Sequence, residues 1–80
     1  MKIEILGTGC YNCVKLEKLI GELVKELALK DAEVSRIDDE RKIRRFIPID
    51  AIPGLLIDGM LVSQRELPDR ETLKQWLIQA

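Results

Sequence analysis

The stretch Gly7-Thr8-Gly9-Cys10-Tyr11-Asn12-Cys13 joins an alternating apolar segment, residues 1–6, to a segment with helical apolar spacing. It contains the only two cysteines among 80 residues, so any sulfur chemistry of this chain is confined to this point. Ile3 and Ile5 alternate with charged side chains, which predicts a strand. The stretch therefore marks the junction between a strand and the helix that follows it.

The spacing of the two cysteines favours a redox pair. A cysteine at a helix start and another three residues later lie on the same side of the first turn, close enough to bridge. The unpaired N–H groups and the positive dipole end of that turn stabilise a thiolate on the first cysteine. Cys10 is therefore the candidate nucleophile, with a pKa below that of a free thiol, and Cys13 is the candidate resolving thiol.

Two simpler interpretations of the cysteines are space-filling thiols and a static disulfide without turnover. A bridge across so short a loop contributes little stability. Free core cysteines also rarely fall at a strand-to-helix junction. We therefore favour turnover over both.

Composition indicates a globular chain, because 46% of its residues are hydrophobic and 34% are charged. Its length predicts one domain, residues 1–80, with a modest core. The formal charge of −1 leaves no net basic field for nucleic acid or anionic lipid. The basic run at residues 41–45 follows three acidic residues, so we interpret it as a solvated helix face with compensating charges.

The sequence shows no signal peptide and no apolar stretch of membrane-spanning length, so we expect a cytoplasmic protein without membrane or nucleic-acid partners. In the cytoplasm a close cysteine pair is more often catalytic or metal-binding than a permanent bridge. A monomer is the default for a small domain with balanced charge.

The first half of the chain predicts a helix, a strand and a short helix after the opening strand. Residues 11–30 carry apolar side chains at helical spacing and form the longest helix. Residues 33–37 predict a second strand. Asp39 then suits the N-cap of a short helix that turns Ile43 and Phe46 inward.

A hairpin and a last helix complete the chain. Asp-Gly at residues 58–59 separates two apolar runs and signals a two-residue hairpin turn, because that turn needs positive φ at both positions. Pro53 opens the first of these strands, where a missing N–H is tolerated. Asp69 suits the N-cap of the last helix, in which we interpret Trp76 as a core anchor.

The predicted order is β-α-β-α-β-β-α. Its β-α-β start requires parallel strands with a right-handed crossover. The expected fold is thus α/β, a four-stranded mixed sheet flanked by three helices, with helices on both faces.

These features together resemble the thioredoxin fold at its minimal, glutaredoxin-like size. More closely, residues 5–13 and 52–59 resemble the compact thioredoxin-like redox-active disulfide proteins of archaea and bacteria, and the resemblance covers almost the whole chain. It implies a thiol–disulfide oxidoreductase that reduces protein disulfides. Its redox centre would be a Cys10–Cys13 disulfide, with no added cofactor and no metal.

The resemblance also implies roles for individual residues. Cys10 would attack a substrate disulfide, and Cys13 would resolve the mixed disulfide and release the reduced substrate. Pro53 matches the family's cis-proline, which turns the backbone of Ile52 toward an extended substrate peptide. The pair Tyr11-Asn12 completes the expected substrate-binding set. The implied partners are disulfide-containing proteins and an electron donor, either a reductase or a low-molecular-weight thiol.

Glu4 is a candidate general base on the same resemblance. It stands six residues before Cys10, the offset of the buried aspartate behind the disulfide of larger thioredoxins. A buried carboxylate there would take the Cys13 proton during resolution. Glu4 alternates with the apolar Ile3 and Ile5, and buried unpaired glutamates are rare. Both observations favour an exposed strand residue instead.

The chain departs from its larger relatives at two places. The pair Tyr11-Asn12 replaces the proline-containing pairs of thioredoxins and glutaredoxins, so the turn between the cysteines is less rigid. Before the last helix, where relatives often carry a glycine beside the active site, this chain has Arg65 and Glu66, which we interpret as solvated loop charges.

Two other functions stay open. Residues 7–13 faintly resemble the Gly-Met-x-Cys-x-x-Cys loop of heavy-metal-associated domains, so Cys10 and Cys13 suit a Cu(I) or other soft-metal-binding protein or chaperone. Thr8 replaces that methionine, however, and those domains end in a strand. Structural zinc would need a second copy to supply four thiolates. The other function is a non-catalytic interaction module that holds a partner around Pro53.

Overall fold

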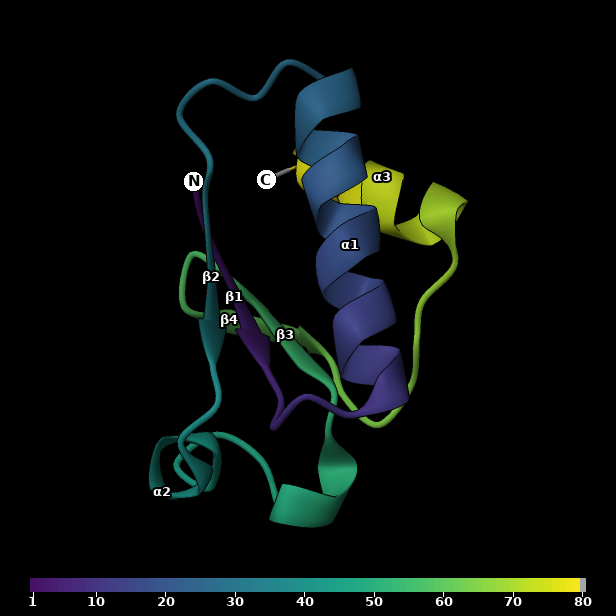
Figure 1. Ribbon diagram of the computed structural model, residues 1–80. Helices are drawn as coiled ribbons and strands as arrows, with labels where there is room; N and C mark the ends of the chain where they lie inside the picture. The colour runs from purple at the N-terminus through teal and green to yellow at the C-terminus, as the bar shows by residue number, and fades with distance from the viewer. Residues whose placement is uncertain (80) are drawn as a thin grey trace.

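The computed structural model describes residues 1–79. Its elements follow the predicted order, with one 3₁₀ turn added before the hairpin (Figure 1). They are β1 (Lys2–Leu6), α1 (Tyr11–Glu26), β2 (Glu33–Ile37), α2 (Glu40–Ile43), the 3₁₀ turn η1 (Ile49–Ala51), β3 (Gly54–Ile57), β4 (Met60–Ser63) and α3 (Arg70–Gln79).

The four strands form one mixed sheet in the order β2-β1-β3-β4. β1 runs parallel to β2 and antiparallel to β3, and β3 runs antiparallel to β4. Asp58 and Gly59 both have positive φ, 51° and 83°, as the hairpin signal requires. The predicted α/β class and four-stranded mixed sheet with three helices are confirmed, and they match a minimal thioredoxin fold.

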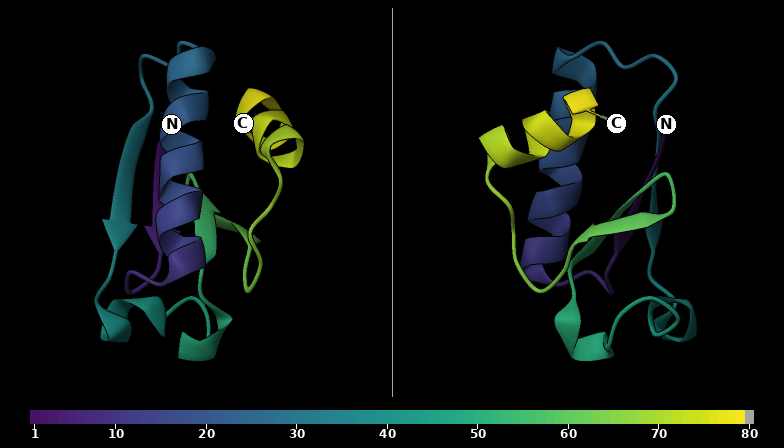
Figure 2. Two further views of the ribbon diagram at one scale, coloured as in Figure 1. Left: turned by 45° about the vertical axis from the view of Figure 1, so that its right-hand side comes forward. Right: turned by 180° about the vertical axis from the view of Figure 1, so that it is seen from behind.

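Two apolar clusters attach the helices to the sheet. α1 and α3 lie on the same face (Figure 2), where the larger cluster comprises Ile3, Ile5, Leu16, Ile20, Leu23, Leu55, Ile57, Leu73 and Leu77. Strand alternation turns Leu6 and Leu56 to the other face, where Ile43 and Ile47 cover them. The segment around α2 therefore packs at the end of the sheet where β1 stops.

Helix ends explain two departures from the predicted elements. α1 ends at Glu26 rather than at residue 30, because Ala28 adopts a φ of 52° and Leu29 donates its N–H back to the carbonyl of Val24 at 3.0 Å. The prediction that Phe46 points inward is wrong, since its side chain is 46% exposed. α2 is only one turn long, and Ile47 takes the buried position instead.

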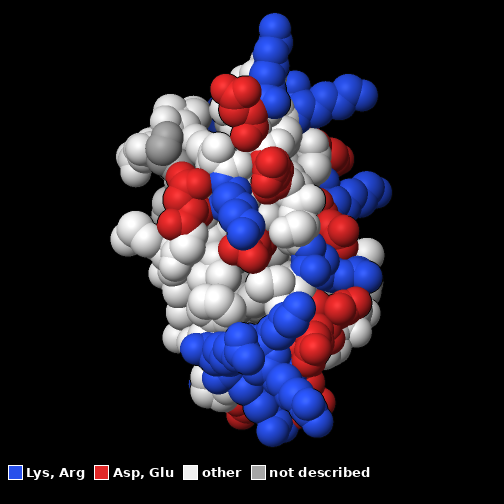
Figure 3. Space-filling view, turned by 90° about the vertical axis from the view of Figure 1, so that its left-hand side faces the viewer, with Lys and Arg blue, Asp and Glu red and all other residues white. Residues whose placement is uncertain are grey.

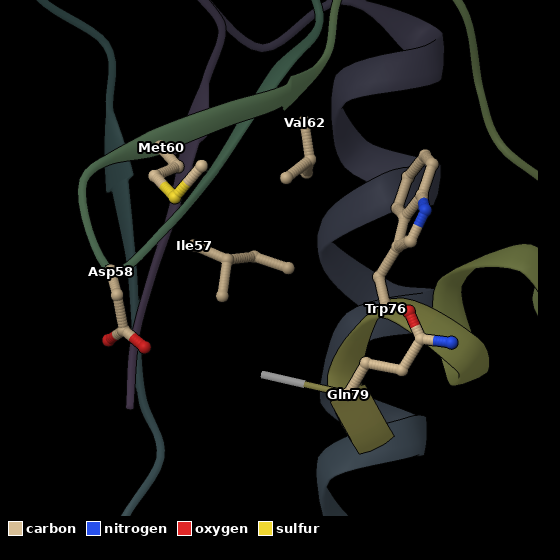
Figure 4. A pocket seen from close by; sticks show the side chains of 6 residues that line it. All are labelled: Ile57, Asp58, Met60, Val62, Trp76 and Gln79. Carbon is tan, nitrogen blue, oxygen red and sulfur yellow. The ribbon is translucent and has the colours of Figure 1, made fainter.

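Trp76 is only partly buried. It packs against the larger cluster and also lines an open groove of about 340 Å³ between the β3–β4 hairpin and α3 (Figure 4). Met60 and Val62 line the same groove from the hairpin. The core-anchor interpretation therefore holds for part of this side chain.

Within residues 1–79, no helix is both long enough and apolar enough to cross a membrane.

The start of α3 generates a pH-dependent prediction. The carboxylate of Asp69 accepts a hydrogen bond from the backbone N–H of Thr72 at 2.8 Å. Hydrogen bonds from the backbone and then the side chain of Thr72 hold the pKa of Asp69 below its ordinary value. The ionised carboxylate therefore contributes stability above its unfolded-state pKa, and this contribution is lost as pH falls through the lower folded-state pKa.

We expect Asp69→Ala to have a lower free energy of unfolding than the parent protein at neutral pH. The gap between the two proteins should become smaller in acid. Urea unfolding at neutral pH and in progressively more acidic buffer measures that difference. Asp69→Asn is the matched control, because it keeps an N-cap oxygen without the charge. A difference between Asp69→Ala and the parent that stays constant with pH would contradict this account.

Candidate active site

The β1–α1 junction places both cysteines at the start of α1. Cys10 is the N-cap residue, with extended backbone angles, and its Sγ accepts a hydrogen bond from the backbone N–H of Cys13 at 3.1 Å. A disulfide joins the two residues, whose Cα atoms lie 4.9 Å apart. The structure thus brings together the two side chains that the sequence singled out.

The two sulfurs differ in access. Cys13 is fully buried, at 0% exposure, whereas Cys10 is partly exposed. Tyr11, between them, is 72% exposed, and Asn12 is also exposed. An incoming sulfur therefore reaches Cys10 from solvent and finds Cys13 covered.

The charge around Cys10 also favours a thiolate after reduction. The first turn of α1 holds no acidic residue, so nothing in it offsets the positive end of the helix dipole. The N–H of Cys13 already points at Cys10 Sγ. A donor in this position stabilises a negative sulfur more than a neutral one.

Gly7 is a site residue that the sequence analysis missed. It is buried, and a Cβ at this position would lie 2.4 Å from Sγ and 2.9 Å from Cβ of Cys13. Its N–H donates to the carbonyl of Ile37 at 3.0 Å, which fixes the loop against β2. The missing side chain therefore lets the end of β1 lie directly against the disulfide.

Pro53 lies at the same end of the sheet. The Ile52–Pro53 peptide bond is cis, as the resemblance implies, with Pro53 buried and Ile52 partly exposed. Gly54, the next residue, pairs with Leu6 in the β1–β3 ladder, and Leu6 directly precedes Gly7. Strand register therefore brings the Pro53 segment beside the loop that leads to Cys10.

The loop after β4 closes on the Pro53 segment through Arg65. Its backbone N–H donates to the carbonyls of Ala51 at 2.7 Å and Pro53 at 3.1 Å. Its φ is 70°, a conformation that glycine adopts at little cost. The Arg65 side chain is 65% exposed, and its guanidinium lies 3.7 Å from the Asp50 carboxylate. The side chain is thus a solvated charge as predicted, while the backbone has a structural role that the sequence does not announce.

Glu4 is partly buried. It is thus neither the fully buried carboxylate of a general base nor the fully exposed strand residue, the two alternatives that the sequence left open. In the sheet it lies beside Ser35 of β2 and Leu56 of β3. Strand alternation places it on the face opposite Ile3 and Ile5, which pack against α1. Its carboxylate therefore belongs to the face of the sheet away from the helix that carries Cys13, and its role as a base stays a prediction.

Candidate metal ligands are sparse in the described part of the chain. Among residues 1–79, no three His, Cys, Asp or Glu side chains are grouped so as to hold a metal ion. Cys10 and Cys13 are the only thiols. A soft-metal site would therefore depend on this pair in its reduced form.

Comparison with known proteins supports the interpretation of this site. The family profile described as "Thioredoxin domain" matches residues 1–78. A protein named "Thioredoxin" from Methanothermobacter thermautotrophicus is 43% identical over 77 residues, which cover 96% of this chain and 97% of the relative. No solved structure shows significant similarity to the chain.

The contact between Gly7 and Cys13 predicts the effect of adding one methyl group. Gly7→Ala cannot keep both residues in place, so we expect the free energy of unfolding of the oxidised protein to fall by about 1–3 kcal/mol. Chemical denaturation measures this change. Gly21→Ala is the matched control, because Gly21 is an exposed position of α1 where an added Cβ would meet nothing within 4 Å beyond its chain neighbours and the adjacent helix backbone.

We expect the control to raise stability by up to about 1 kcal/mol, since alanine is the better helix former. Equal effects of the two substitutions would contradict a tight contact at Gly7.

Proposed function

The chain belongs to the thioredoxin family, and on this premise we propose that it reduces protein disulfides with Cys10 as the nucleophile and Cys13 as the resolving thiol. At the coarser level, it is a thiol–disulfide oxidoreductase. The observation that carries the assignment of roles is the difference in exposure, since Cys10 is accessible and Cys13 is fully buried.

The proposed cycle begins with the reduced pair. The Cys10 thiolate attacks one sulfur of a substrate disulfide, which forms a mixed disulfide and releases the other substrate sulfur as a thiolate that takes up a proton. Cys13 then loses its proton and attacks Cys10 Sγ. The Cys10–Cys13 bond forms, the second substrate sulfur leaves and is protonated, and two electrons have passed from the protein to the substrate.

The local geometry supports both steps. Before attack, the helix start and the N–H of Cys13 stabilise the Cys10 thiolate. After attack, Cys13 is held one turn away on the same side of the helix, so resolution is intramolecular and needs no diffusion of a second thiol.

We propose that the substrate segment lies between the Tyr11-Asn12 pair and the backbone of Ile52. Tyr11 offers an exposed ring next to Cys10, and the ammonium of Lys15 lies 4.5 Å from the ring centroid, which helps to hold the ring. Ile52 comes from the Pro53 segment at the same end of the sheet, so its backbone N–H and C=O can pair with an extended chain.

The partners that this activity needs are of two kinds. Disulfide-containing proteins accept the electrons, and a reductase or a low-molecular-weight thiol returns the Cys10–Cys13 disulfide to the dithiol.

The two serine variants distinguish the roles of the cysteines. We expect Cys13→Ser to accumulate a covalent mixed disulfide between Cys10 and a disulfide-containing peptide, because attack remains and resolution is lost. We expect Cys10→Ser to lose disulfide reduction and to form no such adduct at a comparable rate, because its remaining thiol is buried. Intact-protein mass spectrometry of the metal-free proteins follows both adducts over time.

The same pair of variants tests the other functions. Faster adduct formation by Cys10→Ser than by Cys13→Ser would reverse the assigned roles. If the parent protein reduces no peptide while Cys10→Ser still binds it, the chain is an interaction module rather than an oxidoreductase.

A further inference from the structure

Four exposed cations gather on and just after α2, and we call Arg41, Lys42, Arg44 and Arg45 the α2 cationic patch. Figure 3 shows Lys and Arg side chains packed together over this part of the molecule, with acidic side chains to one side. The patch supplies four of the 13 cations in a chain of net charge −1, so the rest of the chain carries a formal charge of −5. The patch is thus a local concentration of positive charge on an otherwise acidic molecule.

The acidic residues that precede the patch do not neutralise it. Asp38 lies 4.0 Å from Arg36, outside the patch, and Asp39 accepts the backbone N–H of Arg41 as the α2 N-cap. Only Glu40 forms an ion pair with a side chain of the patch, that of Arg44. Among the described residues, no carboxylate lies within 4 Å of the side-chain nitrogens of Arg41, Lys42 or Arg45. The interpretation of this run as a face with compensated charges is therefore revised for these three side chains.

The patch is carried by a segment that is linked to the disulfide loop through the end of β1. Ile43 of α2 and Leu6, the last residue of β1, belong to the same buried apolar cluster. Ile37, which precedes α2 by three residues, accepts the hydrogen bond of Gly7, and Gly7 lies against Cys13. α2 and the start of α1 accordingly lie at the same end of the molecule in Figure 1.

The sequence around the disulfide carries few acidic side chains. Residues 5–16 contain no Asp or Glu, and Lys15 is their only charged residue. Residues 51–57 contain no charged residue at all. Asp50, the carboxylate next to this segment, lies 3.7 Å from Arg65. The exposed Glu66, next to Arg65, is a further carboxylate of this loop. A partner that approaches Cys10 therefore meets mostly uncharged segments, with the α2 cationic patch at the same end of the molecule.

We propose that the α2 cationic patch binds an acidic surface of the partner protein, so that the enzyme prefers disulfides flanked by Asp and Glu. This inference rests on the proposed function, because it names the class of substrate for the same site. Charge complementarity beside a reacting group raises the rate of productive encounter, and salt screens it. The patch thus selects the partner, while the cysteines perform the exchange.

Three synthetic peptides test this preference. They share one length and one intramolecular disulfide, and the flanking residues are all glutamate, all serine or all lysine. Rate constants for their reduction by the dithiol form of the protein come from acid quenching and mass spectrometry. We expect the glutamate peptide to react about tenfold faster than the serine peptide at low salt. The lysine peptide should react more slowly than either, and the differences should disappear in concentrated salt.

Two double variants with the same change in net charge locate the effect. Arg41→Glu/Arg45→Glu alters the patch, and Lys25→Glu/Lys30→Glu alters exposed positions at and beyond the C-terminal end of α1. We expect the patch variant to lose the preference for glutamate and to reduce the serine peptide at the parent rate. The Lys25/Lys30 variant should keep the preference.

Equal rates for the three peptides, or a glutamate preference that survives in the patch variant, would overturn the inference and leave the proposed function intact. Failure of the parent protein to reduce the serine peptide would overturn the proposed function itself. Patch-dependent binding of a single-stranded DNA oligomer together with equal peptide rates would assign the patch to nucleic acid and also overturn the inference.

Discussion

The site depends on the close approach of Gly7 to Cys13. Because Gly7 has no side chain, the end of β1 lies directly against the first turn of α1, where any larger residue would push the disulfide away. The same short segment binds Ile37 of β2 through Gly7 and pairs with Gly54 of β3 through Leu6. The contacts of Leu6 and Gly7 together therefore position the disulfide, the Pro53 segment and the start of the α2 segment.

Chemistry and partner selection come from different elements of this arrangement. α1 supplies the reactive pair, with Cys10 capping its start in reach of solvent and Cys13 buried one turn later. In the proposed function, the hairpin side supplies a backbone for an extended substrate. The α2 segment contributes charge, because its apolar side chains are used in packing and its cations remain at the surface. A domain of this size thus separates the reacting atoms from the features that choose what reacts.

Local patterns in the sequence were sufficient to predict the strands, the hairpin and α1. Apolar alternation, the Asp-Gly pair and helical spacing each depend only on residues that are neighbours in the chain. The cysteine pair was found for the same reason. Contacts between distant segments were not predictable in this way. Nothing in Gly-Thr-Gly distinguishes Gly7, which meets Cys13, from Gly9, whose φ of 96° serves the turn. The bonds of the Arg65 N–H to Ala51 and Pro53 likewise depend on two loops meeting in space.

The measurement that tests the central claim most directly is the redox equilibrium of Cys10 and Cys13. Metal-free protein is equilibrated in defined thiol–disulfide buffers, and free thiols are counted by mass. The account predicts a reversible two-electron transition of an intramolecular pair, between about −180 and −300 mV, the range of working oxidoreductases. A pair that forms no intramolecular disulfide, or a disulfide that no buffer in this range reduces, would contradict it.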